Sequence, residues 1–463
     1  MNKQNKQPVA IDLFAGAGGL SEGLLSAGFN VTVAIEGHPH PALTHAFNHS
    51  KTTVLCGDIR LVTVKKLMYH VERNTGSSKV DLIAGGPPCQ GFSSAGKRDK
   101  QDPRNKLIHE FVRIVEAINP NIFIFENVPG LGRFYGGTTL HTVLDKFWEI
   151  GYEIHGIDNQ SDFYPEDYPI TDSSLFGVPQ QRRRLILVGW KKGAIQQLPW
   201  HTTNNNSHSQ STSSVTVNEA ISDLDFLSGG YECHTYQSKP QSQYQNERRK
   251  NSRLLFNHLA TKHRVATVNM FRRFKPGSSV NSIDKNYRTG KQRVYRLCPD
   301  KVSPAVLALP DDYIHPRRHR IPTVRELARL QSFDDDYVFL GKRTTSDKNR
   351  RVDVPQYTQV GNAVPPLLAK KLGETILTAF GYDTCDLRDL DERSKRHSWI
   401  LGSSGFHGYE LSEEAEDSID LISLDNSSIS LPICLNRKRK SNQNIGIVNW
   451  TKQRRRKLNY NSK

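Results

Sequence analysis

The strongest constraint on the fold of this chain is the alternation of short apolar runs with amphipathic segments over its first 190 residues. Strands and helices that alternate in this way are typical of a mostly parallel sheet covered by helices on both faces. We therefore predict an α/β fold with ligand-binding residues at the strand ends. The expected strands are residues 9–14, 31–36, 53–56, 81–84, 122–126 and 185–189, and the expected helices are 19–27, 42–48, 107–117 and 140–150.

The remainder of the chain has a different character. Residues 201–218 are rich in Asn, Ser, Thr and His, which is typical of an exposed loop. Basic and aromatic residues are then interleaved without a clear period between 231 and 320. Helical periodicity returns at 324–330 and 366–380, and the chain beyond 381 is polar, with basic runs. We predict that this last part is largely disordered, although its apolar spots could dock elsewhere on the protein.

Charge and cysteine content restrict the class of protein. The chain has 63 Lys and Arg residues against 47 acidic ones, a formal charge of +16. This excess favours a polyanionic partner such as nucleic acid, although a merely basic cytosolic protein has the same balance. No apolar run reaches the roughly 18 residues of a membrane span, so we expect a soluble intracellular protein without a membrane partner. The six cysteines form no C-x-x-C pair, so we expect no metal site.

A glycine-rich turn follows the first expected strand and includes Gly16, Gly18 and Gly19. Glycines in such a turn let the backbone approach a nucleotide, and Glu36, about 20 residues on, stands where an acid hydrogen-bonds a ribose. The same pattern is found in nicotinamide-dependent oxidoreductases and in simple tight turns. Ser21 occupies the place of the third glycine of the dinucleotide fingerprint, which favours a nucleoside without a pyrophosphate, such as S-adenosylmethionine.

A second loop, residues 85–93, contains two prolines, three glycines and Cys89 directly after an expected strand. Ligands of open α/β sheets bind at such strand ends, so Cys89 is a candidate nucleophile. The alternative is a buried cysteine that packs as a small hydrophobic residue.

Polar residues also flank the fifth and sixth expected strands. Glu126 ends the fifth strand, either as a structural acid or facing the same crevice as Cys89. Before the sixth strand, alternation places Gln180, Arg182 and Arg184 on one face, although a run of arginines is often a solvated surface.

Taken in order, these motifs resemble those of the DNA cytosine-5 methyltransferases. Two further motifs of that family follow at residues 325–333 and 359–366, so the resemblance covers residues 8–381 with a gap in the middle. Six motifs in the family's order make the resemblance specific. The chain is most like the bacterial restriction–modification methylases, because it has one catalytic core and no visible large additional domain.

The resemblance implies roles for the catalytic residues. Cys89 would add as a thiolate to carbon 6 of cytosine, which makes carbon 5 nucleophilic. Glu126 would hydrogen-bond the exocyclic amine and ring nitrogen 3 in a dry site. Arg184, supported by Arg182 and Gln180, would brace the flipped base and its phosphate.

The resemblance also implies an S-adenosylmethionine pocket that is assembled from distant parts of the sequence. Because two of its residues come after position 360, the late helix must pack back against the first strands. The implied cofactor contacts are Phe14, Gly16, Gly18, Gly19, Glu36, Asp58, Ile59, Pro88, Leu107, Asn362 and Val364.

The family's organisation implies a Rossmann-like S-adenosylmethionine-dependent methyltransferase fold with a smaller, irregular target-recognition domain. Residues 8–190 would form the catalytic and cofactor-binding core, 191–320 the target-recognition region, 321–381 the motifs that return to the core, and 382–463 the disordered tail. In this interpretation basic clusters at 248–250, 272–275 and 317–320 contact DNA phosphates.

We therefore predict a monomeric enzyme that methylates carbon 5 of a flipped cytosine in double-stranded DNA, in the bacterial cytoplasm near the nucleoid, paired with a restriction endonuclease. Two alternatives are a tRNA cytosine-5 methyltransferase and a catalytically silent DNA-binding relative. We also expect that truncation after Gly381 leaves the chemistry intact and makes DNA binding more sensitive to salt.

Overall fold

The computed structural model describes residues 7–88, 107–132, 137–157, 168–200, 214–288, 294–345, 349–403, 408–419 and 421–424. Everything stated below concerns these residues. Cys89 lies outside them.

A nine-stranded sheet forms the centre of the described structure, in the order β15-β3-β2-β1-β4-β5-β9-β6, with β7 paired to β9. The pairings from β15 to β5 are parallel, and those that involve β9 are antiparallel. The predicted mostly parallel α/β fold is therefore confirmed. The strands are β1 (Val9–Leu13), β2 (Asn30–Glu36), β3 (Thr53–Cys56), β4 (Leu82–Gly85), β5 (Ile122–Asn127), β6 (Tyr152–Ile154), β7 (Ile170–Asp172), β9 (Arg183–Lys191) and β15 (Leu421–Ser423).

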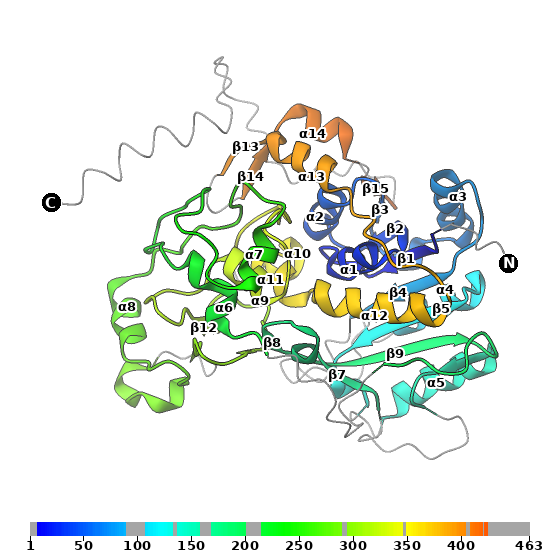
Figure 1. Ribbon diagram of the computed structural model, residues 1–463, viewed down its shortest axis with the longest axis horizontal. Helices are drawn as coiled ribbons and strands as arrows, with labels where there is room; N and C mark the ends of the chain where they lie inside the picture. Colours follow the sequence, from blue (N-terminus) through cyan, green and yellow to red (C-terminus); the bar gives the residue numbers. More distant parts are fainter. Residues whose placement is uncertain are drawn as a thin grey trace.

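Helices cover both faces of this sheet because its strands are apolar on both sides. In β1, Ile11 packs with one group of helices, while Ala10 packs with the helices of the opposite face. The first group is α3 (Val64–Thr75), α4 (Leu107–Ile118) and α5 (Thr138–Glu149), and the opposite face carries α1 (Gly19–Ala27) and α12 (Pro366–Ala379). Helix α2 (Pro39–Asn48) packs beside α1 and β3 (Figure 1).

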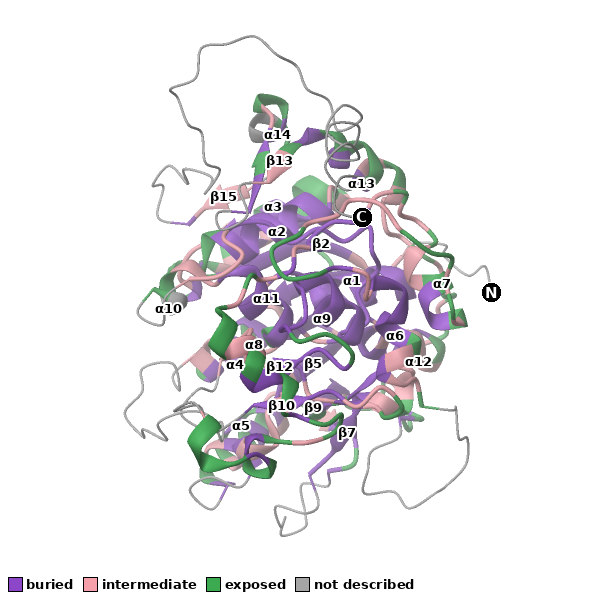
Figure 2. Ribbon diagram, turned by 90° about the vertical axis from the view of Figure 1, so that its left-hand side faces the viewer, coloured by how far each residue is buried: buried purple, intermediate pink, exposed green. Residues whose placement is uncertain are grey.

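A second lobe lies beside the sheet, on the left of Figure 1. It has its own core, to which α6, α8, α9 and α11 all contribute. Helix α9 is buried through its whole length (Figure 2), and a capping box at Thr323 and Glu326 begins it. Its elements include α6 (Val217–Ile221), α7 (Gln243–Arg249), α8 (Val265–Arg272), α9 (Val324–Leu330), α11 (Gln356–Asn362), β8 (Gln180–Gln181), β10 (Tyr295–Arg296), β11 (Ser303–Pro304) and β12 (Tyr313–Ile314).

The prediction of a disordered tail beyond residue 381 is wrong for residues 382–403, 408–419 and 421–424, which we call the C-terminal extension. It contains α13 (Leu390–Arg396), β13 (Ile400–Ser403), β14 (Tyr409–Leu411), α14 (Glu413–Ser418) and the sheet strand β15. A polar composition usually indicates residues in solvent, but arginines of this segment are buried in ion pairs. Arg393, for example, is 1% exposed and is paired with acids of other elements. Residues 425–463 lie outside the described ranges.

No helix in the described part of the chain combines the length and the apolar character that crossing a membrane requires.

Candidate active site

The predicted site residues gather at one edge of the sheet. Strands β1, β2, β4 and β5 are parallel, with Leu13 opposite both Ile35 and Gly85, and Gly85 opposite Phe125. Their carboxyl ends therefore meet at the same edge. This edge carries the glycine turn, Glu36, the loop that leads to Cys89, and Glu126.

The glycine turn after β1 forms an open cradle. Phe14 and Gly16 have φ values of 58° and 56°, in the left-handed region. The backbone N–H of Gly16 donates to Glu36 Oε2 at 2.9 Å, and a Cβ built on Gly16 would meet no atom of the described residues within 4 Å. The outer side of the turn is thus free to receive a ligand at close range.

Glu36 ends β2 and lies beside this cradle. Its Oε1 accepts the backbone N–H of His38 at 2.9 Å, and the carboxylate is fixed from two sides. Oε1 also lies 3.1 Å from His38 Nδ1. A carboxylate oxygen has two lone pairs, so Oε2, which accepts the Gly16 N–H, has a second one that can accept a ribose hydroxyl. The residues present therefore fit the nucleoside part of S-adenosylmethionine.

Asp58 and Ile59 have different environments. Ile59 is buried, whereas the Asp58 carboxylate accepts hydrogen bonds from Arg60, and these bonds lower its pKa. The Asp58 carboxylate is therefore already hydrogen-bonded to Arg60, and its predicted contact with the cofactor stays a prediction. Among the other predicted cofactor contacts, Asn362 is exposed, and Pro88, Leu107 and Val364 are half-buried.

The late part of the chain does return to the first turn. A Cβ on Gly19, the first residue of α1, would lie 2.4 Å from the carbonyl oxygen of Val364. A Cβ on Gly23 would lie 2.4 Å from the Cβ of Ala369 in α12. The prediction that the late helix packs against the start of the chain is confirmed, and small residues on α1 are what allow it.

Glu126 and Arg184 form an ion pair at the same edge. Arg184 Nε lies 3.0 Å from Glu126 Oε1, with side chains 17% and 14% exposed. A Cβ on Gly86 would lie 2.8 Å from Glu126 Oε2, so the carboxylate sits against the start of the loop that leads to Cys89. The pair is shielded yet still reachable by a ligand.

Asn127 is a site residue whose role the sequence analysis missed. Its Nδ2 donates to the carbonyl oxygen of Pro87 at 3.0 Å, and the side chain is buried. It thereby fixes the loop two residues before Cys89. Its position directly after Glu126, in the motif at the end of β5, could have indicated this role.

The predicted alternation before β9 is confirmed: Gln180 and Arg182 are buried, while Gln181 and Arg183 are exposed. Gln180 Oε1 accepts the N–H of Val306 at 2.8 Å, and Arg182 Nη1 donates to the Val306 carbonyl at 3.1 Å.

Arg182 nevertheless keeps one unused donor. Burial, reinforced by the charge of Arg184, lowers its pKa to about 9. Its Nε is buried and has no hydrogen-bond partner among the described residues. Such a donor is costly unless a ligand accepts from it.

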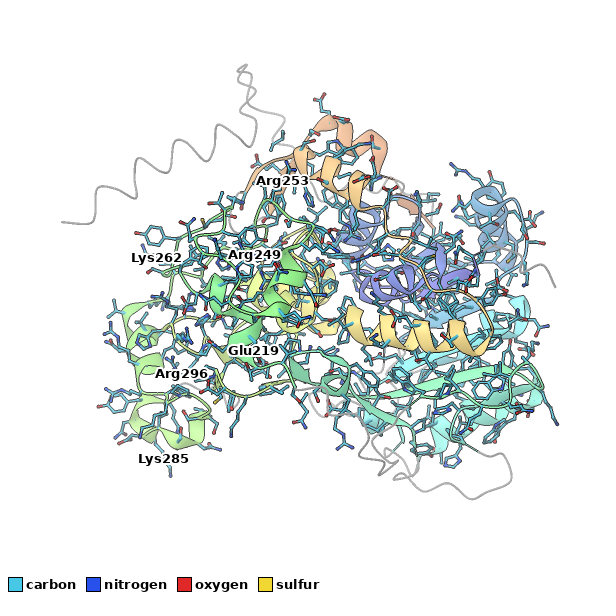
Figure 3. All side chains as sticks on the ribbon, in the orientation of Figure 1. Glu219, Arg249, Arg253, Lys262, Lys285 and Arg296 are labelled. Atoms are coloured by element: carbon cyan, nitrogen blue, oxygen red, sulfur yellow. The ribbon has the colours of Figure 1, made fainter. Side chains whose placement is uncertain are left out.

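Some basic residues of the second lobe are buried in ion pairs, whereas others are exposed and can contact DNA phosphates. Arg320 is bidentate with Glu326, and Arg249 pairs with Asp223, so these arginines serve the interior. The exposed basic residues include Arg253, Lys262 and Lys285 (Figure 3), and Arg272, Arg273 and Lys275 around the end of α8.

The mostly parallel sheet is that of the Rossmann-like methyltransferases. The positions of Glu36 beside the glycine turn and of the Glu126–Arg184 pair at the start of the loop that leads to Cys89 fit this class. Comparison with known proteins makes this more specific. The family model for C-5 cytosine-specific DNA methylase matches residues 9–378. The chain belongs to this family and is a DNA (cytosine-5) methyltransferase.

Among similar proteins, the type II methyltransferase M.DdeI of Desulfomicrobium norvegicum is 37% identical over 386 residues, covering 79% of this chain and 88% of the relative. The type II methyltransferase M1.HphI of Haemophilus parahaemolyticus is 35% identical over 375 residues, covering 79% and 86%. A crystal structure of a protein described as a prophage DNA modification methyltransferase of E. coli superposes with a TM-score of 0.62 at 25% identity, covering 80% and 99%.

Proposed function

We propose that this protein transfers the methyl group of S-adenosylmethionine to carbon 5 of a cytosine flipped out of a specific duplex sequence. In this proposal it is the monomeric modification enzyme of a restriction–modification system, works on DNA in the bacterial cytoplasm and is paired with an endonuclease. The type II names of its relatives support the biological role. The observation that carries the chemistry is the Glu126–Arg184 pair held against the cysteine loop.

Covalent catalysis overcomes the weak nucleophilicity of carbon 5. The Cys89 thiolate forms a bond to carbon 6, and the electron pair displaced from the ring double bond becomes available at carbon 5. When bound, S-adenosylmethionine supplies an electrophilic methyl group there. A base then removes the carbon 5 proton, and the carbon 6–sulfur bond breaks to restore the ring and the thiolate.

Glu126 holds a proton at ring nitrogen 3 and accepts from the exocyclic amine, so that charge can develop on the ring. Arg184 keeps the carboxyl group in this orientation through its ion pair. The Nε donor of Arg182, which has no partner among the described residues, would donate a hydrogen bond to the base or its phosphate.

Glu36 would hold the ribose hydroxyls of the cofactor, and the turn from Gly16 to Gly19 would contact the cofactor through its backbone. Asp58 and Ile59 would contact the adenine. Further cofactor contacts would come from Phe14, Pro88, Leu107, Asn362 and Val364. In the second lobe, the exposed basic residues Arg272, Arg273 and Lys275 position the DNA through its phosphates.

Methyl transfer to unmethylated genomic DNA tests the proposal. Purified protein and S-adenosylmethionine are incubated with the DNA beside a Cys89→Ala variant, and 5-methylcytosine is mapped by bisulfite sequencing. We expect methylation at one recurrent sequence with wild type and none with the variant. Methylation of tRNA alone, or none by a folded protein that binds the cofactor, would overturn it.

A further inference from the structure

The C-terminal extension reaches the cofactor turn, although it lies beyond the residues 9–378 that the family model matches. Arg393 of α13 binds Glu22 of α1 in a bidentate pair, with Nη2 to Oε2 at 2.6 Å and Nη1 to Oε1 at 3.1 Å. Arg388 adds a contact of 2.9 Å to Glu22 Oε1. Both Arg393 and Glu22 are almost completely buried.

The same arginine supports the residues beneath the turn. Glu22 Oε2 lies 3.0 Å from His49 Nε2, and the Arg393 guanidinium lies 5.2 Å from the centre of the Tyr337 ring. A Cβ on Gly18 would lie 2.7 Å from both His49 Cε1 and the Tyr337 hydroxyl oxygen. The hydroxyl of Tyr337 also donates to the carbonyl of Ala17. The glycine turn therefore packs directly on the rings of His49 and Tyr337. Glu22 contacts the first ring, and Arg393 lies over the second.

A second contact joins the extension to the same edge of the sheet. Strand β15 pairs with β3, and a Cβ on Gly57 would lie 2.9 Å from the Cβ of Leu424. The N–H of Gly57 donates to the carbonyl oxygen of Glu36 at 2.9 Å. The extension thus borders the cofactor cradle from two sides.

We propose that Arg393 is a positioning residue for the cofactor turn, so that the C-terminal extension is a working part of the S-adenosylmethionine site. This inference rests on the proposed function, because it assumes that the cofactor binds in that turn. Arg393 acts through Glu22, His49 and Tyr337 and does not touch the cofactor. The support is pre-organised, since these buried groups hold one another in a single arrangement.

Arg393→Gln in the full chain tests the inference, with S-adenosylmethionine affinity measured by calorimetry and affinity for a duplex measured without cofactor. We expect the cofactor Kd to rise about tenfold through loss of turn support, while the DNA Kd changes by less than about twofold. Arg393→Lys keeps the charge and loses the fork, so its effect should be intermediate. It also provides a folded variant if the glutamine variant does not fold.

Arg320→Gln is the matched control, because Arg320 is an equally buried arginine that is bidentate with Glu326 in the second lobe. We expect it to lose thermal stability but to bind the cofactor as wild type does. Equal weakening of cofactor binding in both variants, or unchanged binding in both Arg393 variants, would overturn the inference. If wild type binds no S-adenosylmethionine, the proposed function itself fails, and the inference with it.

Discussion

At the scale of single residues, Glu126 carries the most specific prediction. Replacing it by glutamine keeps the shape but removes the group that holds a proton on the base, so methyl transfer should fall about 100-fold or more. Cofactor affinity should stay unchanged because Glu126 is not among the predicted cofactor contacts. Glu153→Gln, on β6 beside Trp190, is the control and should retain full rate in a methyl-transfer assay. A Glu126→Gln variant with a normal rate would contradict this role.

Asp12, beneath the glycine turn, gives a prediction of pH dependence. Its Oδ2 accepts from the Ser21 hydroxyl at 2.6 Å, and burial raises its pKa from 3.8 to about 7. The folded state therefore binds this proton more tightly than the unfolded state. Its contribution to stability is greatest below pH 4 and declines by up to about 1.4 kcal/mol per pH unit until about pH 7.

Asp12→Asn removes this titration, so wild type should lose more stability than the variant between pH 4.5 and pH 7.5. Urea unfolding of both proteins at three pH values measures the difference. Parallel profiles would show that Asp12 does not change its protonation in this range.

At the scale of elements, the contact between α1 and α12 depends on glycine. Gly23→Ala places a methyl group 2.4 Å from the Cβ of Ala369 and 2.5 Å from the Pro366 carbonyl oxygen, so the helices must separate. We expect the free energy of unfolding to fall by about 1–3 kcal/mol, and cofactor affinity to fall with it. Gly402→Ala is the control, since its Cβ would meet no atom within 4 Å in the described part of the chain. Equal stability of the two variants in urea unfolding would contradict this packing.

Strands of the central sheet could be predicted from the sequence more accurately than strands of the second lobe. The central strands were predicted to within two residues because burial on both faces makes them continuous apolar runs. The strands of the second lobe were missed because several, such as β8 and β10, are two residues long and show no period. Glu126 and Arg184 were found through local motifs. Arg393 was not, because its role arises only when α13 packs against α2 and its side chain reaches Glu22 of α1.

At the scale of the whole molecule, the C-terminal extension changes the expectation for truncation. A chain that ends after Gly381 loses Arg388 and Arg393 and leaves Glu22 and Asp336 buried without these partners, which typically costs about 3–5 kcal/mol. Such a chain should unfold at a markedly lower temperature and bind the cofactor weakly. We therefore no longer expect that truncation after Gly381 leaves the chemistry intact.

A chain that ends after Leu424 tests the same account from the other side. It keeps every described residue and removes basic runs at 437–440 and 454–457. We expect its melting temperature to match wild type and its DNA affinity to decline at low salt. Thermal unfolding of the two truncated chains beside wild type distinguishes them, and equal melting temperatures would contradict the structural role of the extension.

Covalent trapping would reveal the proposed bond between Cys89 and carbon 6 of the target cytosine. A duplex that carries 5-fluorocytosine at the mapped target lets the thiolate add and the methyl group join, but leaves no carbon 5 proton to remove, so the protein stays attached. With S-adenosylmethionine present, we predict a complex that survives denaturing electrophoresis for wild type and none for Cys89→Ala. A wild-type enzyme that methylates the ordinary duplex without being trapped, or a Cys89→Ala variant that is trapped equally, would contradict the account.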